Sequence, residues 1–168
     1  MTRPRDRLPP VVVSCVSHLN NLKCVIGMAD LLKQLDVLGL DLIILKDGVT
    51  IFSRAGDGII PLMEAVEALG LEQLNGSVVA DKVVGKAAGL IIGYFKARYV
   101  HTKVLSKRGA LILDACGIGC CTEEIVEEIL NKDGTDMCPF ERAVLNIEDP
   151  MGGYEVLNKT AKGVPRRT

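Results

Sequence analysis

The chain has 168 residues, of which 48% are hydrophobic and 24% charged, and its formal net charge is −1. A chain of this length and apolar content is expected to fold as one domain with an aliphatic core, which excludes an intrinsically disordered protein. A net charge so close to zero provides no positive field that would hold phosphate groups, so we expect no nucleic-acid binding.

The two ends of the chain differ in composition from its centre. Residues 1–22 are rich in Pro, Arg and Asn and show no sustained period, whereas a domain-like pattern begins at Met28. We therefore predict a flexible N-terminal extension over residues 1–27, one domain over residues 28–160 and a basic tail over residues 161–168. Met28 is also a candidate for the natural start of the protein.

Two apolar runs resemble export or membrane segments and are rejected as such. Residues 10–16 follow three arginines, but no small-residue cleavage site comes after them. Residues 87–95 are about half as long as a bilayer crossing requires. We expect a cytoplasmic protein with no export signal and no membrane span.

Apolar periodicity and turn residues predict the elements of the first half. Asp47-Gly48 lies between two β-prone runs, which is the strongest short signal for a β-hairpin. Gly39 and Gly70 follow helical patterns and are expected to end them. In chain order we predict a helix over 29–38, hairpin strands over 41–46 and 49–53, a helix over 60–69, a short strand over 77–80 and a helix over 81–95 that is buried between layers.

The second half of the chain is expected to alternate short strands and helices. Pro139 suits the first turn of a helix that Cys138 opens, and Asp149-Pro150 lies beyond its end. Strands interleaved with helices predict a covered sheet, and the hairpin makes that sheet mixed. The predicted fold is α/β, a three-layer α/β/α sandwich. Its later elements are a strand over 99–101, a helix over 104–115, a strand over 118–121, a helix over 123–130, a turn over 131–136, a helix from 138 that ends before 149, and a last helix over 154–159.

The spacing of cysteine and histidine predicts no metal site. The chain is large enough to fold without disulfide staples and its cysteines are irregularly spaced, so we expect reduced cysteines and no disulfide framework. No pair is spaced C-x-x-C, and His18 and His101 lie far from the cysteines in sequence. We therefore expect no metal ion and no cofactor. The six cysteines are Cys15, Cys24, Cys116, Cys120, Cys121 and Cys138.

Two segments resemble the signature motifs of a known family. They are residues 80–88, Ala-Asp-Lys-Val-Val-Gly-Lys-Ala-Ala, and residues 131–144, which contain Asn-Lys-Asp-Gly-Thr and Cys-Pro-Phe-Glu. With the hairpin and residues 147–150, they resemble a small uncharacterised prokaryotic domain-of-unknown-function family of the cytidine-deaminase-like superfamily, over roughly residues 31–158. The resemblance implies a cytidine-deaminase-like fold and no established activity. Because members of the superfamily often assemble, it also raises a homo-oligomer as an expectation.

The resemblance shows at the same time what this chain lacks. Zinc deaminases take one ligand and a proton-shuttling carboxylate from a helix that opens with His-x-Glu, and two ligands from a helix that opens with Pro-Cys-x-x-Cys. Here Asp81-Lys82 stands where the first motif would be, and Cys138-Pro139 with Phe140-Glu141 stands where the second would be. One thiolate and one carboxylate do not make a three-ligand zinc site, so zinc-dependent deamination is not expected.

Asp81, Lys82 and Lys86 are candidate site residues. If a helix begins at Asp81, its carboxylate either caps that helix or acts as a base. Lys82 would place a cation at the positive end of the helix, and a bound anion would remove that conflict. Lys86, one turn later, would share a face with Lys82. The two ammonium groups then either bind a phosphate or carboxylate, or are simply solvated.

Gly85, Gly89 and Gly93 recur every four residues along the same predicted helix. The groove that they leave favours the close packing of a neighbouring element over the approach of a ligand. Gly85 lies nearest the predicted site and is kept as a ligand-binding candidate.

Cys138 and Glu141 are the candidates of the second motif. Cys138 is expected at an N-cap, where a helix terminus favours the thiolate form, unless it is simply a small buried cysteine. Glu141 is either a ligand-binding residue or the capping-box acid of its own helix. If Lys82 and Cys138 meet across the fold, each ion would stabilise the other as a nucleophilic pair.

Three functions remain open. The leading hypothesis is a domain without catalytic zinc that binds a small anionic or nucleotide-like ligand near Asp81, Lys82 and Cys138. The alternative is a cysteine-dependent enzyme of the sulfur- or acyl-transfer type, with Cys138 as nucleophile, Lys82 as electrostatic stabiliser and Asp81 as base or orienter. The third is a non-catalytic regulatory or assembly domain. The first two require that the helix starts at Asp81-Lys82 and Cys138-Pro139 point into one cleft.

Overall fold

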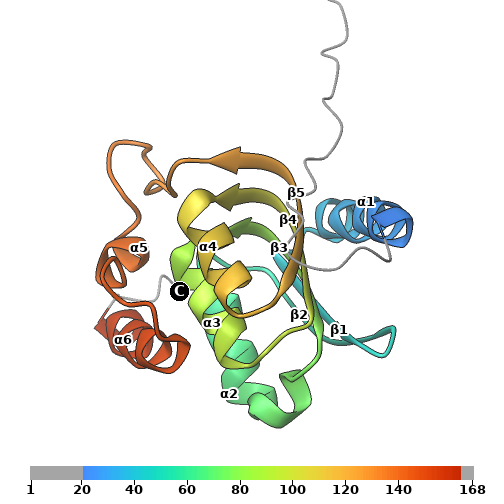
Figure 1. Cartoon of the computed structure of the whole chain (residues 1–168), viewed down its shortest axis with the longest axis horizontal. Coiled ribbons are helices and arrows are strands. Elements are labelled where there is room, and N and C mark those ends of the chain that lie inside the picture. Colours follow the sequence, from blue (N-terminus) through green and yellow to red (C-terminus); the bar gives the residue numbers. More distant parts are fainter. Residues whose placement is uncertain (1–20, 164–168) are drawn as a thin grey trace, which may run out of the picture.

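The computed structural model describes residues 21–163, with side chains from residue 30 onward. Helices and strands alternate along most of this range (Figure 1). In chain order the elements are α1 (Asn21–Leu38), β1 (Leu42–Lys46), β2 (Val49–Arg54), α2 (Ile60–Leu74), β3 (Val78–Val84), α3 (Lys86–Tyr94), β4 (Tyr99–Ser106), α4 (Lys107–Ala115), β5 (Gly119–Val126), α5 (Pro139–Ala143) and α6 (Pro150–Gly163).

The strands form one mixed sheet in the order β2-β1-β3-β4-β5. Strands β3, β4 and β5 run parallel, and β1 runs antiparallel to both β2 and β3. Figure 1 shows α1 against one face of the sheet and α2, α3 and α4 against the other, with α5 and α6 beyond α3. The predicted α/β fold with a mixed sheet between helical layers is confirmed.

Each face of the sheet has its own apolar cluster. The larger one fills the space between the sheet and α2, α3 and α4, where Ile44, Leu90 and Ile91 are fully buried. The smaller one, which includes Leu35 and Ile43, lies under α1. Burying one large aliphatic side chain stabilises a fold by about 1.5–3 kcal/mol, so these two clusters hold the three layers together.

The predicted hairpin and the helices before and after it are confirmed. Asp47 and Gly48 both have positive φ angles, 52° and 78°. This combination is the type I′ turn that suits the twist of a two-residue hairpin. The helix predicted over residues 29–38 is the later part of α1. Gly70, with φ 74°, interrupts α2 where the prediction ended it, and a further turn continues to Leu74.

The predicted helix over residues 81–95 is wrong in its first part. Residues 78–84 form β3, and α3 begins only at Lys86. Strand β3 lies between β1 and β4 with helices over both faces, so its apolar residues face both layers. Such a strand has a near-continuous apolar sequence that periodicity does not distinguish from a buried helix.

Two later predictions also mistook strand for helix. Strand β4 continues to Ser106, whose hydroxyl accepts a hydrogen bond from the backbone N–H of Gly109 at 2.9 Å and so caps α4. The predicted helix over 123–130 is wrong, because β5 runs to Val126 and pairs in parallel with β4. Strand β5 lies at the edge of the sheet and its second half is exposed. The mixture of polar and apolar residues there resembles the sequence of a surface helix. The predicted strands over 99–101 and 118–121 were therefore too short.

The last helices and the ends of the domain differ from the predicted bounds. Helix α5 begins after Cys138 as expected but ends at Ala143, and α6 is longer than predicted. The predicted boundary at residue 28 falls inside α1, and the one at residue 161 falls inside α6. The other parts of the extension and tail lie outside the described residues, and the division into three parts stays a prediction.

Two further findings concern membrane spans and the state of the cysteines. No helix in the described range is both long and apolar enough to cross a membrane. Cys121, in the cluster under α1, is disulfide-bonded, so the expectation of reduced cysteines is wrong at this position. The hydroxyl of Tyr99 lies 2.8 Å from its sulfur.

Candidate functional site

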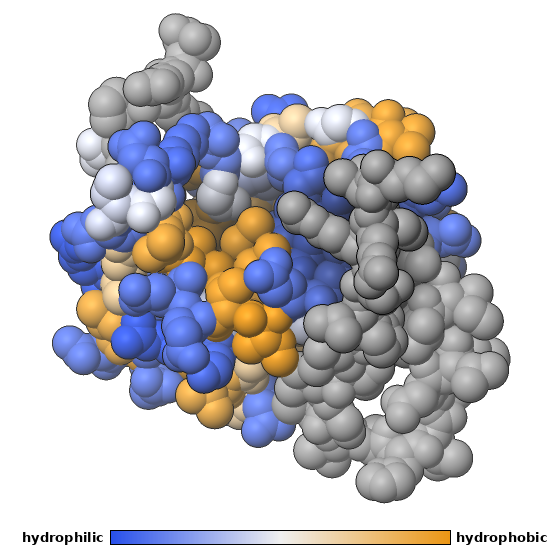
Figure 2. Space-filling view, turned by 90° about the horizontal axis from the view of Figure 1, so that it is seen from above, coloured by the Kyte–Doolittle hydropathy of each residue, from blue (hydrophilic) through white to orange (hydrophobic). Residues whose placement is uncertain are grey.

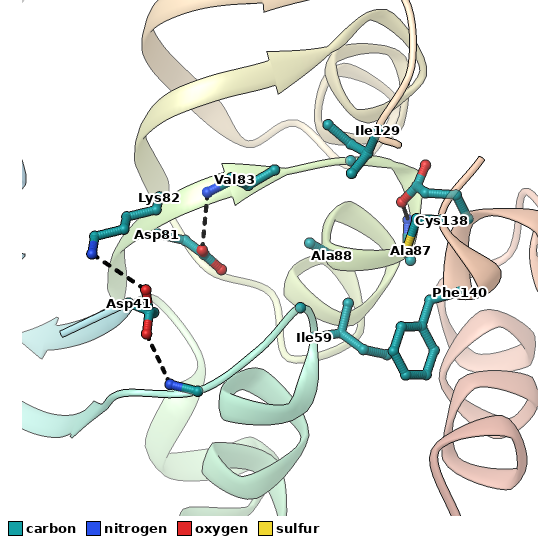
Figure 3. A pocket seen from close by; sticks show the side chains of 14 residues that line it. Asp41, Ile59, Asp81, Lys82, Val83, Ala87, Ala88, Ile129, Cys138 and Phe140 are labelled. Carbon is teal, nitrogen blue, oxygen red and sulfur yellow. Dashed lines mark hydrogen bonds and ion pairs between the residues drawn. The ribbon is translucent and has the colours of Figure 1, made fainter. Parts of the chain in front are cut away.

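A cavity of about 100 Å³ opens where β3, the start of α3, the loop before α2 and the start of α5 come together (Figure 3). Its chemically active lining residues are Asp41, Asp81, Lys82, Cys138 and Glu141. The remaining lining residues are apolar or glycine: Gly56, Gly58, Ile59, Val83, Gly85, Ala87, Ala88, Ile129 and Phe140. A mostly apolar wall with a few convergent polar groups is typical of a small-molecule site.

Asp81 is held in the middle of the sheet. It belongs to β3, where it pairs with Leu42 of β1 and Thr102 of β4, and its exposed fraction is 7%. Its Oδ1 accepts a hydrogen bond from the backbone N–H of Val83 at 3.2 Å. It is therefore a buried carboxyl group on the cavity wall, and the prediction that it opens a helix is wrong.

Burial raises the pKa of Asp81 from 3.8 to about 7. The Val83 N–H opposes this shift, and the nearby charge of Asp41 adds to it. Water removed from a carboxylate destabilises its charged form, and a second negative charge does the same. A carboxyl group that titrates near neutrality is able to donate or accept a proton under ordinary conditions, as acid–base and ligand sites require.

Lys82 is paired within the protein. Its ammonium lies 3.3 Å from Oδ1 of Asp41, and both side chains are partly exposed. Oδ2 of Asp41 accepts the backbone N–H of Gly56 at 2.9 Å, which fixes the loop before α2. In Figure 3 the Lys82 side chain extends toward Asp41 and away from Asp81.

Glu141 closes the N-terminus of α3 from a different helix. Its two carboxylate oxygens accept the backbone N–H groups of Lys86 at 3.0 Å and Ala87 at 2.8 Å. Burial raises the pKa of Glu141, because the loss of water outweighs the two N–H groups and the nearby cations that favour the charged form. The expected capping box within α5 is therefore wrong, since Glu141 caps α3 across the fold.

Lys86 does not line the cavity. It is 4% exposed, and its ammonium donates to the carbonyl oxygen of Leu145 at 2.9 Å and to Oε1 of Glu148 at 2.8 Å. The expected shared face of Lys82 and Lys86 is wrong, because one residue lies on a strand and the other on the next helix. Lys86 instead ties the start of α3 to the segment between α5 and α6.

Cys138 occupies the N-cap position of α5, as predicted, and is half-buried at the cavity wall. Its side chain makes no capping hydrogen bond. In Figure 3, Cys138 and Lys82 lie at opposite ends of the group of lining residues, with Ala88 between them. The two motifs thus share one cavity, but the figure gives no support to a direct Lys82–Cys138 pair.

Close packing explains two of the three glycines that recur every four residues, Gly85 and Gly93. A Cβ atom on Gly93 would lie 2.7 Å from the sulfur of Cys116, whereas one on Gly89 would lie at an ordinary contact distance of 3.4 Å from Ile112 of α4. Gly85 precedes α3 as its N-cap and meets Glu141 and Ile129. The packing interpretation from the sequence is confirmed for Gly93 and not for Gly89, where an added methyl group would make an ordinary contact.

Sequence reasoning missed Asp41, Ile59 and Phe140 as site residues. Asp41 stands just before the hairpin, and Phe140 lies inside the second motif, so both had a weak signal in their positions. In the described part of the chain, no group of three His, Cys, Asp or Glu residues is arranged to hold a metal ion.

Comparison with known proteins identifies the family. A family model described as "Domain of unknown function (DUF1893)" matches residues 30–160, which include both motifs. The chain belongs to the DUF1893 family. A DUF1893 family protein (TM1506) from Thermotoga maritima has a similar crystal structure, with a TM-score of 0.71 at 30% sequence identity. That match covers 88% of this chain and 93% of that one. No curated protein matches the sequence.

The DUF1893 membership confirms the predicted kind of family, a domain of unknown function. The assignment of DUF1893 to the cytidine-deaminase-like superfamily is not tested by these matches and stays a prediction. The roles of the site residues likewise stay predictions, although the residues that line the cavity are now known.

Proposed function

We propose that this DUF1893 protein binds a small nucleotide-like ligand in the cavity between β3 and α5. Asp81 contacts the polar edge of the ligand's ring, the apolar walls enclose the ring, and Lys82 at the rim binds its anionic group. The observation that carries the proposal is Asp81, a carboxyl group that is 7% exposed and has a pKa raised to about 7 at a cavity wall. Buried ionisable groups with such shifts concentrate at functional sites.

The size and lining of the cavity support a small ligand. Drug-sized sites measure about 300–1,000 Å³, so a cavity of about 100 Å³ suits one ring or a short polar fragment. Phe140 and Ile59 supply an apolar wall on one side. The resemblance to the cytidine-deaminase-like superfamily supports the nucleotide-like class of ligand.

The proposal contains no zinc-dependent step. The sequence lacks the His-x-Glu and Pro-Cys-x-x-Cys ligands of zinc deaminases, and Asp81, Cys138 and Glu141 do not form a three-ligand metal group. The proposed role of Asp81 is to exchange a hydrogen bond with the ligand, either as an acceptor or, when protonated, as a donor.

A thermal-shift screen with nucleosides, nucleotides and phosphorylated metabolites tests the proposal. A ligand present at about 100 times its Kd should stabilise the folded state by about 2.7 kcal/mol and raise Tm accordingly. Asp81→Asn and Lys82→Met should each lose most of that gain. Asp114→Asn on α4 and Lys159→Met on α6 are matched controls at exposed positions and should retain it. A screen in which no compound raises the Tm of the wild-type protein contradicts the proposal and favours an assembly role.

A cysteine-dependent reaction is a second candidate, because the half-buried Cys138 lines the same cavity as Asp81. In that version Cys138 is the nucleophile and Asp81 orients the ligand or accepts a proton. The two candidates differ in the reactivity that they require of the Cys138 thiol.

A further inference from the structure

The three carboxyl groups of the cavity wall differ in the hydrogen-bond and ion-pair partners of their oxygens. Asp41 has a partner for each oxygen, the ammonium of Lys82 and the N–H of Gly56. Glu141 has two backbone N–H groups. Asp81 has the N–H of Val83 on Oδ1, and the backbone N–H of Lys82, which also favours the charged form of Asp81, donates to the carbonyl oxygen of Asp41. Among the described residues, no donor forms a hydrogen bond of normal geometry to Oδ2, which lies on the cavity wall.

In the part of the chain that the structure describes, no positive group near Asp81 is free to hold an anion at this end of the cavity. Lys82 extends to Asp41, and its backbone N–H donates to the carbonyl oxygen of Asp41 at 3.2 Å. The ammonium of Lys86 is used by the carbonyl oxygen of Leu145 and by Glu148. The N–H groups of Lys86 and Ala87 at the start of α3, which would otherwise attract an anion, are occupied by Glu141.

The groups of the cavity wall beside Asp81 are therefore mainly acidic. An anion placed beside Asp81 would meet the carboxylates of Asp81 and Asp41 with no free cation, which is unfavourable in a partly dry site. A group with N–H donors would supply the partner that Oδ2 lacks. This is opposite to the expectation from the sequence, which placed an anion against Lys82 and Lys86.

We propose that the part of the ligand that reaches Asp81 is an N–H donor of the amidine, guanidine or amine type, and that any anionic part lies outward at Lys82. This inference rests on the proposed function, because it takes the same cavity as the binding site. It fixes the direction in which the ligand enters, with its donor edge toward β3 and its charged group toward the rim.

Three probes of one shape and different charge test the inference: acetamidinium, acetamide and acetate. Binding is followed at pH 8, where Asp81 is mainly ionised, by NMR titration of the backbone amides of Val83, Ala87 and Ala88. Acetamidinium should bind at least tenfold more tightly than acetate, with acetamide between them. Asp81→Asn should weaken acetamidinium binding at least tenfold and change acetamide binding less than threefold.

Two variants distinguish a specific contact from a general preference for cations. Lys82→Met removes the cation at the rim and should strengthen acetamidinium binding, because the Asp41 carboxylate is released. Asp114→Asn, on the exposed side of α4, should leave it unchanged. Acetate binding as tightly as acetamidinium, or no amide shift with any probe, overturns the inference. The nucleotide screen is scored separately, so a ligand found there together with preferential acetate binding would retain the cavity as the site and reject only this orientation.

Discussion

Gly85 lies so close to Glu141 that a Cβ atom on residue 85 would be 2.4 Å from Oε1 of Glu141. It would also be 2.7 Å from Cγ1 of Ile129, and real Cβ contacts are essentially never shorter than 3.0 Å. The absence of a side chain at Gly85 is therefore what allows the Glu141 carboxylate to reach the first N–H groups of α3. This contact joins the two sequence motifs at the cavity.

Gly85→Ala should consequently destabilise the protein by about 1–3 kcal/mol, because the added methyl group overpacks the contact and displaces the Glu141 carboxylate from buried N–H groups. Urea denaturation measures the loss. Gly89→Ala is the matched control, since its nearest contact would be 3.4 Å and alanine favours a helix interior by about 0.5–1 kcal/mol. Equal stabilities of the two variants would contradict the close fit at residue 85.

Lys86→Met should cost about 1–3 kcal/mol of folding free energy. The methionine keeps the buried stem but leaves the carbonyl oxygen of Leu145 without its donor, and an unsatisfied buried acceptor carries that penalty. Glu148→Gln removes the charge of the other partner, whose side chain is 79% exposed, and should change stability by less than about 1 kcal/mol. Chemical denaturation of both variants separates the two contributions. Similar losses would mean that the ion pair, not the Leu145 contact, holds the start of α3.

The sequence predicted those elements whose signals are local. The Asp47-Gly48 turn and the Cys138-Pro139 helix start are defined by a few adjacent residues, and both are confirmed. The error at Asp81 arose because β3 is buried on both faces, so its apolar residues follow neither period clearly. The error at residues 123–130 arose because one half of β5 is exposed at the edge of the sheet.

The sequence predicted which residues line the site better than it predicted how they contact one another. Asp81, Lys82, Gly85, Cys138 and Glu141 line one cavity, although neither the capping role of Glu141 nor the Lys82–Asp41 pair was expected. Both contacts join residues that are more than forty positions apart in the sequence, Lys82 with Asp41 and Lys86 with Glu141. Such contacts depend on the tertiary fold, and helix-local rules place an acid such as Glu141 on its own helix instead.

Alkylation of Cys138 distinguishes the binding proposal from the cysteine-dependent one. We expect its rate with iodoacetamide at pH 7.5 to be no greater than that of glutathione, because the thiol is half-buried and Lys82 lies at the far end of the lining residues. Peptide mapping compares Cys138 with Cys116, whose pKa is raised by burial and which serves as the internal reference. A Cys138 rate well above that of glutathione, abolished in Cys138→Ser, would favour the enzyme.

Asp81→Asn should change how the stability of the protein depends on pH. The pKa of Asp81 is raised by folding from 3.8 to about 7, so the folded state favours the protonated form. The contribution of this group to stability is complete below about pH 4 and is lost as the pH rises toward 7 and above. A shift of this size lowers the free energy of unfolding of the wild-type protein by on the order of 4 kcal/mol. The asparagine side chain does not ionise, so the variant does not lose this stability.

Urea denaturation of the wild-type protein and Asp81→Asn at several pH values between 4 and 8 measures this difference. The variant should gain stability relative to wild type as the pH rises, with most of the change between pH 5 and 7.5. The other charged groups that face Asp81 are Asp41 before β1, Lys82 on β3 and Glu141 on α5, and they are common to both proteins. Asp114→Asn should run parallel to wild type. A stability difference that stays constant across the range would mean that Asp81 ionises freely in the folded protein, and the cavity would then lack the carboxyl group of raised pKa that the proposed ligand site requires.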